Sequence, residues 1–168
     1  MTRLPLLASL LAGCGDPETI VEDVRIPVAL LDARGGRCEA NAFEETVSAS
    51  VELIQPLGPD PENPLGYCVL EGDCVQVPAR SLGDRDALQQ ALRDQGPFFE
   101  GLPPYNDVLL FVRGTQYDDC QFSPAEDPLF CGASAIVNIA DAQASFTVAV
   151  SCQIDSACLL APPCAGSD

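Results

Sequence analysis

The stretch Asp107–Arg113, with the sequence DVLLFVR, determines what kind of fold this chain can form. Alternate side chains of an extended strand face opposite ways, so both faces here are apolar: one carries Val108, Leu110 and Val112, and the other carries Leu109 and Phe111. Strands that are apolar on both faces are typical of a sheet covered on its two sides. The stretch therefore predicts a central strand in a layered fold.

Other parts of the chain have the period-two alternation of half-buried strands. Residues 23–30 alternate in this way but contain Pro27, which cannot donate to a ladder, so this strand is expected at a sheet edge. Residues 47–53 predict a further strand. Residues 134–140 and 145–152 predict a final hairpin.

One segment has helical spacing instead. Apolar residues recur at Ala87, Leu88, Ala91 and Leu92, Ser81 can act as the N-cap, and a Gly-Pro pair at 96–97 ends the run. The predicted fold is therefore mainly β: a single antiparallel β-sandwich over residues 23–152 with one short helix, residues 82–94. This order of elements resembles transthyretin-type and immunoglobulin-like secreted modules, a resemblance that implies the sandwich and no function.

A hairpin is predicted from the sequence YCVLEGDCVQV at residues 67–77. Cys68 and Cys74 lie symmetrically about Glu71, and Glu-Gly-Asp at 71–73 has the composition of a turn. Cross-strand neighbours lie about 4.5–5.5 Å apart at Cα, within the reach of a disulfide. We therefore expect a Cys68–Cys74 bridge.

The cysteine count indicates a disulfide framework. Nine cysteines are present, and setting Cys14 aside leaves an even number, as expected for an exported chain with up to four bridges. Cys120 and Cys131 are expected to close the loop between them. The pairing of the remaining four stays open: Cys38, Cys152, Cys158 and Cys164. Of the possible bridges among them, Cys158–Cys164 and Cys38–Cys152 are preferred.

The amino-terminal segment has the pattern of an export signal: a basic residue at Arg3, then a short apolar run, then small residues before Cys14. Its ending, LAGC at residues 11–14, resembles the lipobox of bacterial lipoproteins. The resemblance implies removal of residues 1–13, lipidation and acylation of Cys14, and a membrane anchor. Gly15, rather than Asp, after the cysteine implies the outer membrane. Residues 14–22 are then a lipidated tether, and residues 153–168 a tail pinned by disulfides.

Charge and composition exclude several classes of function. The chain has 25 acidic residues against 8 arginines, with a net charge of −17, which disfavours nucleic acid and anionic lipid headgroups as partners. It contains no His, which removes the usual general base and most catalytic zinc sites. No phosphate-binding or dinucleotide motif is present. The composition therefore favours a non-enzymatic protein without a cofactor or a metal.

Two alternatives remain. A pair of carboxylates is sufficient for glycoside hydrolysis, so a hydrolase acting on envelope or extracellular carbohydrate is the first. The second is a weak calcium- or carbohydrate-binding module, although solvated surface acids explain the acidic clusters better because none has EF-hand spacing. The acidic clusters are Asp60-Glu62-Asn63, Asp84-Asp86, Asp118-Asp119 and Glu126-Asp127.

The leading hypothesis is an anchored envelope protein that binds a protein or carbohydrate partner or has a structural role.

Overall fold

A computed structural model describes most of the predicted domain: residues 22–32, 38, 40–58, 66–78, 85–102, 105–120, 128–136, 138–139, 146–152, 158 and 162–164. Several sequence predictions lie outside these residues. They are the signal peptide, the lipidation site Cys14, the N-cap Ser81, and the acidic clusters at 60–63 and 126–127. Neither helix in the described part of the chain has the length and apolar character needed to span a membrane.

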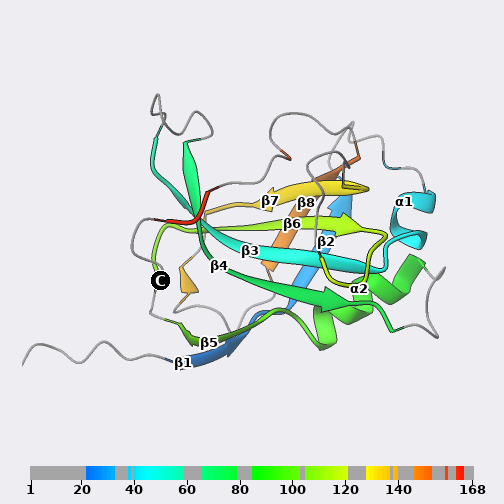
Figure 1. The fold of residues 1–168 in the computed structure, drawn as a ribbon, viewed down its shortest axis with the longest axis horizontal. Coiled ribbons are helices and arrows are strands. Elements are labelled where there is room, and N and C mark those ends of the chain that lie inside the picture. The colour runs from blue at the N-terminus through cyan, green and yellow to red at the C-terminus, as the bar shows by residue number, and fades with distance from the viewer. Residues whose placement is uncertain are drawn as a thin grey trace, which may run out of the picture.

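A six-stranded sheet forms the body of the molecule, in the order β2-β8-β7-β6-β3-β4 (Figure 1). The strand predicted from DVLLFVR is β6, which lies in the interior of this order, and all but the first of its residues are buried. The strands are β2 (Val28–Asp32), β3 (Ser48–Pro56), β4 (Tyr67–Gln76), β6 (Leu109–Thr115), β7 (Phe130–Ser134) and β8 (Phe146–Ser151).

A second, two-stranded sheet pairs β1 (Glu22–Arg25) with β5 (Phe98–Leu102). Helices α1 (Ala40–Glu44) and α2 (Arg85–Asp94) complete the fold. The prediction of a mainly β, disulfide-linked domain with two sheets is confirmed. Two details differ: α1 is a second helix, and β2 pairs parallel to β8 while the other strand pairs are antiparallel.

Pro27 divides the first predicted strand between the two sheets. Residues before it form β1, and residues after it form β2 at the edge of the large sheet. The Ile26 amide donates to the Pro97 carbonyl at 3.0 Å, and the Pro27 carbonyl accepts from the Phe146 amide at 2.9 Å. The expected edge position is thus correct for β2, and the proline marks the transfer of the chain between sheets because it interrupts the ladder.

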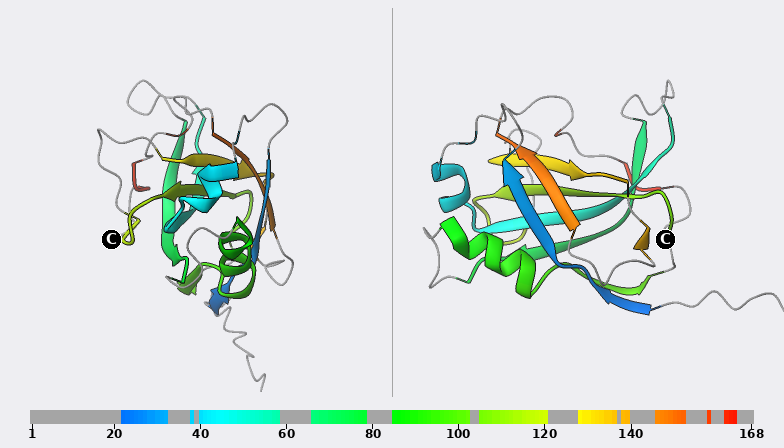
Figure 2. Two further views of the ribbon diagram at one scale, coloured as in Figure 1. Left: turned by 90° about the vertical axis from the view of Figure 1, so that its right-hand side faces the viewer. Right: turned by 180° about the vertical axis from the view of Figure 1, so that it is seen from behind.

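Helix α2 covers one face of the large sheet, which we call the inner face. Figure 2 shows α2 between β2 and β4 on the hollow side of the sheet. The four apolar residues that predicted the helix are all buried in the main core, together with Leu110 and Val112 of β6. Gln89 of α2 also closes the edge of β2: its amide accepts from the Leu30 amide at 3.2 Å and donates to the Leu30 carbonyl at 2.6 Å. The helix therefore supplies both apolar cover and edge protection.

The opposite, outer face carries a smaller apolar cluster built around Ile54, Phe111, Cys131 and Cys158. Cys158 and Pro162–Cys164, here called the C-terminal strap, contribute the cover. The Val69 amide donates to the Pro162 carbonyl at 2.9 Å, and the Cys164 amide donates to the Val69 carbonyl at 2.8 Å. The strap therefore pairs with β4, and Figure 1 shows its red segment next to that strand. Both faces of β6 are covered, as its sequence requires.

The hairpin predicted over residues 67–77 is wrong, because these residues form the continuous strand β4. Glu71 pairs with Leu53 and Gly72 with Glu52, next to a register shift at which Leu70 of β4 has no partner residue in β3. The turn-like composition at 71–73 is overridden by pairing along β3 and accommodated by this irregularity. Cys68 and Cys74 are six residue steps apart along this strand, a separation of about 20 Å that is beyond disulfide reach.

The final hairpin is displaced from its predicted position. Its second arm is β8, as expected, and it pairs antiparallel with β7. The first arm is Phe130–Ser134, however, and not residues 134–140. The reason is on the facing strand: Phe130 to Ala133 pair with Gly114 to Phe111 of β6, so the position of β6 sets that of β7.

The four disulfides join Cys38 to Cys152, Cys68 to Cys164, Cys74 to Cys120, and Cys131 to Cys158, with Cα–Cα distances of 4.8, 4.9, 5.8 and 5.7 Å. The framework of eight paired cysteines is confirmed, and so is Cys38–Cys152. The expected bridges Cys68–Cys74, Cys120–Cys131 and Cys158–Cys164 are wrong. Each of these expected bridges joins cysteines close in sequence, whereas the bridges formed connect strands to distant segments.

We expect Gly96→Ala to destabilise the domain. Gly96 ends α2 with φ +53°, and an added Cβ would lie 2.6 Å from the Ile26 carbonyl oxygen. The left-handed backbone and this contact together should lower the free energy of unfolding by about 1–3 kcal/mol, measured by urea titration.

Gly58→Ala is the matched control. Gly58 has φ +80°, but nothing lies within 4 Å of an added Cβ, so only the backbone preference is lost. Equal urea midpoints for the two variants would show that close packing against Ile26 does not constrain the helix end.

Candidate functional site

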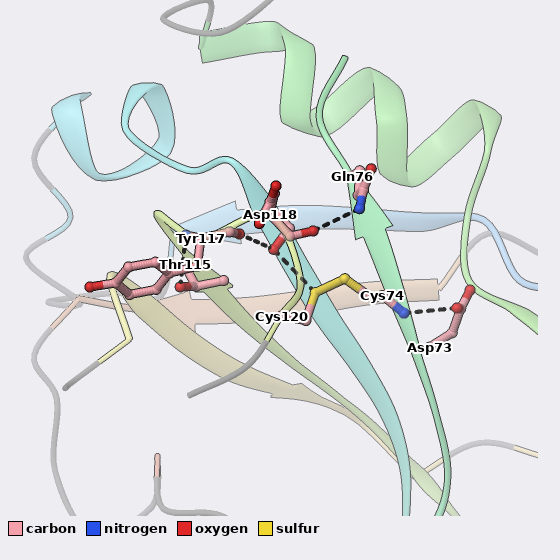
Figure 3. Close-up of a disulfide and its surroundings, with 8 residues drawn as sticks. Asp73, Cys74, Gln76, Thr115, Tyr117, Asp118 and Cys120 are labelled. Atoms are coloured by element: carbon pink, nitrogen blue, oxygen red, sulfur yellow. Dashed lines mark hydrogen bonds between the residues drawn. A yellow bond between two sulfur atoms is a disulfide. The ribbon is translucent and has the colours of Figure 1, made fainter. Parts of the chain in front are cut away.

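The segment that follows β6 is the most distinctive surface feature of the described residues. Residues Gln116–Cys120, here called the anchored loop, leave the large sheet and turn back over the start of β3 and the end of β4 (Figure 3). The Cys74–Cys120 disulfide fixes the end of the loop to β4. Asp118 and Asp119 form a turn.

Hydrogen bonds fix the main chain of the loop at successive residues. Ser48 Oγ donates to the Tyr117 carbonyl at 2.6 Å, and Gln76 Nε2 donates to the Asp118 carbonyl at 2.7 Å. The Tyr117 amide donates to Thr115 Oγ1 at 3.2 Å. These contacts come from β3, β4 and β6, so three strands of the sheet position one short loop.

The first four side chains of the loop are exposed, while the carbonyls of Tyr117 and Asp118 are held from the sheet. Gln116, Tyr117, Asp118 and Asp119 are exposed, and Tyr117 is 37% exposed. Cys120 has φ 52°, a left-handed conformation that is unfavourable for a side chain other than glycine and is held here by the disulfide. The loop therefore displays a phenol and two carboxylates on a backbone ordered before any partner arrives.

Rigid display of this kind suits binding. A tyrosine gives a large contact area with few rotatable bonds and can also form a hydrogen bond, which is why this residue is common at the centres of interfaces. The adjacent carboxylates are complementary to a basic surface. Among the described residues, no group of three or more acidic or cysteine side chains has an arrangement that could hold a metal ion.

Beneath the outer face lies a buried ion pair that links β3 and β6. Arg113 Nη2 donates to Glu52 Oε1, and the two side chains are 1% and 14% exposed. The Arg113 guanidinium also lies 5.4 Å from the centre of the Phe111 ring, within cation–π range. Burial lowers the pKa of Arg113 to about 10, so the guanidinium stays charged at neutral pH.

This ion pair is only partly visible in the sequence. Arg113 ends the apolar stretch, and Glu52 occupies a polar position of the next predicted strand. Their meeting depends on the register that places Ser50 opposite Arg113 and Glu52 opposite Phe111. This register could not be derived from either segment alone.

Other carboxylates of the described residues accept hydrogen bonds from backbone amides of the domain. Asp73 accepts hydrogen bonds from the Cys74 and Phe98 amides at 2.8 and 2.7 Å. Asp23 accepts from the Gly101 amide at 3.0 Å. Glu52 binds Arg113. These three carboxylates serve structural contacts, and the hydrolase and the calcium or carbohydrate module stay predictions.

Phe98, Phe99 and Tyr105 could stack on a sugar ring only if they shared one exposed surface, but they are divided between core and surface. Phe99 is buried in the main core, and Tyr105 packs partly buried against it. Phe98 is 38% exposed, with the Arg25 guanidinium 5.2 Å from the centre of its ring. The structure does not bring the three together on one exposed face.

Comparison of the chain with family models, with curated proteins and with solved structures found no match. The lipobox and the sandwich resemblance therefore rest on the sequence patterns described above.

We expect Glu52→Gln to lower the free energy of unfolding by about 3 kcal/mol, because breaking a buried ion pair leaves an uncompensated charge in the interior. Chemical denaturation at neutral pH measures this loss. Replacing both members, in Glu52→Leu/Arg113→Met, should recover most of it because no charge is then buried.

Glu71→Gln provides the control, since Glu71 lies on the neighbouring strand with an exposed side chain. Exposed substitutions of this kind usually change stability by less than about 0.5 kcal/mol. A loss for Glu52→Gln no larger than that for Glu71→Gln would contradict a structural role of the pair.

Proposed function

We propose that the protein is a membrane-anchored lipoprotein of a bacterial cell envelope with a non-enzymatic binding role. The single observation that carries the proposal is the assignment of the cysteines. Eight of the nine are joined in four disulfides, and the ninth is Cys14. A framework of this kind belongs to an oxidising compartment outside the cytoplasm, and the remaining thiol stands where the lipobox pattern requires one.

The anchor and the framework have separate tasks in this proposal. Stable membrane attachment requires more than one acyl chain, which the lipoprotein modification of Cys14 would supply. The disulfides would stabilise the domain outside the cytoplasm, where cytoplasmic reductants do not reach them. Gly15 favours the outer membrane as the destination.

Binding is assigned to the anchored loop. This loop combines a fixed main chain with an exposed Tyr117 and two adjacent carboxylates. A partner that fits this surface presents basic side chains around a pocket for an aromatic ring. The lack of His in the chain and the structural use of Glu52 and Asp73 favour binding over catalysis.

Cys14→Ser tests the anchor. We expect the variant to keep its signal sequence uncleaved by lipoprotein peptidase and to lose lipid, as measured by mass spectrometry, and to leave the detergent-soluble membrane fraction. The double variant Cys74→Ser/Cys120→Ser removes two cysteines without touching the anchor, so it should remain with membranes. Lipidation of Cys14→Ser would sink the proposal.

Tyr117→Ala tests the binding surface. The chain contains no lysine, so a carbodiimide can couple its carboxylates to amines of a partner without joining lysines of the protein itself. Loss of an interface aromatic typically costs about 2 kcal/mol or more, or roughly thirtyfold in affinity. We expect capture of the partner in the native envelope to fall accordingly.

Leu57→Ala is the matched control for this experiment. Leu57 is another large exposed apolar residue, 57% exposed, and it follows the far end of β3 from the loop. Equal capture by the two variants, at wild-type level, would exclude the anchored loop as the contact surface.

A further inference from the structure

The chain enters the described fold at one end of the molecule. Glu22 begins β1, which pairs antiparallel with β5, so that Glu22 lies opposite Leu102 at the end of β5. Figures 1 and 2 show this two-stranded ribbon projecting at the opposite end of the molecule from α1. Any tether attached to the amino terminus of β1 therefore holds the molecule by its β1–β5 end.

The covalent distance from anchor to fold is short. Eight residue steps separate Cys14 from Glu22, which allows at most about 29 Å when fully extended, and a flexible chain of this length averages roughly 15–17 Å end to end. The nine residues of β3 alone lead about 26 Å away from the anchored loop. The average length of the tether is thus shorter than the domain it holds, so the tether limits which surface reaches the membrane.

Charge acts in the same direction. At the α1 end, Glu44, Glu45, Asp118 and Asp119 are exposed. The negative potential of a membrane containing anionic lipid attracts basic groups and repels acidic ones within a Debye length. The β1–β5 end also has exposed acids, Asp23 and Glu100, but it adds an exposed arginine and is therefore the less acidic of the two ends. The guanidinium of this Arg25 lies beside the exposed ring of Phe98, a pairing of cation and aromatic ring that suits the membrane interface.

From the tether length and this charge distribution, we propose that the β1–β5 ribbon is the membrane-facing surface of the anchored protein. The lipid surface lies against Arg25 and Phe98, and the α1 end with the anchored loop points away from the bilayer. Tyr117 is then presented to partners in the surrounding compartment and not to lipid. This inference rests on the proposed lipid anchor at Cys14.

Two single-lysine variants test the orientation. Because the chain has no lysine and the lipoprotein modification acylates the terminal amine, Glu100→Lys and Glu45→Lys each introduce a unique site for an amine-reactive fluorescent donor. Both residues are exposed and both substitutions make the same change of charge. Glu100 lies on β5, and Glu45 follows α1. The lipidated proteins are reconstituted into phosphatidylcholine vesicles that contain a trace of acceptor-labelled lipid.

We expect energy transfer to the membrane from position 100 to exceed that from position 45 by roughly twofold or more, given a domain about 26 Å or more in length. Adding phosphatidylglycerol should lower the transfer from position 45 further. Equal transfer from the two positions, or more from position 45, would overturn the orientation. Failure of the unlabelled wild type to float with the vesicles would instead contradict the anchor, so the two proposals fail by different results.

Discussion

The structure depends on the need to cover both faces of β6. Its apolar side chains alternate between the main core and the outer cluster, so a sheet covered on one side only would expose Phe111 and Leu109 to water. Helix α2 covers the inner face by ordinary packing of an amphipathic helix. The outer face has no helix over it in the described residues, and there the C-terminal strap takes this role.

Disulfides make a short strap adequate for this purpose. A few residues bury too little apolar surface to offset the entropy of ordering them, but Cys131–Cys158 and Cys68–Cys164 hold the strap at two points. Native bridges typically contribute about 2–4 kcal/mol each, with more expected for longer loops. Cys38–Cys152 spans 114 residues and joins the region before α1 to the end of β8. On the outer face, disulfides thus supply stability that a larger apolar core would otherwise provide.

A disulfide also orders the surface proposed for binding. Cys74–Cys120 adds nothing to the core clusters, yet it fixes a loop whose carbonyls are held by Ser48 and Gln76. Ordering the loop in the free protein reduces the entropy lost on association. Held by its β1–β5 end, the molecule would present that loop on the side away from its anchor. Framework, display and anchor would then each use different cysteines of one chain.

The sequence by itself determined the elements whose signal is local. The burial of β6, the apolar face of α2, the strand β3 and the even set of disulfide cysteines were all predictable, because side-chain periodicity and residue count do not depend on distant partners. It also contained the LAGC pattern at residues 11–14. Only the tertiary structure decided that residues 67–76 form one strand, that β2 lies parallel to β8, that Arg113 meets Glu52, and which cysteines pair. These outcomes depend on how segments far apart in the sequence are brought together; the bridged cysteines, for example, are 27 to 114 residues apart. The register between such segments is set by the packing of the whole sheet.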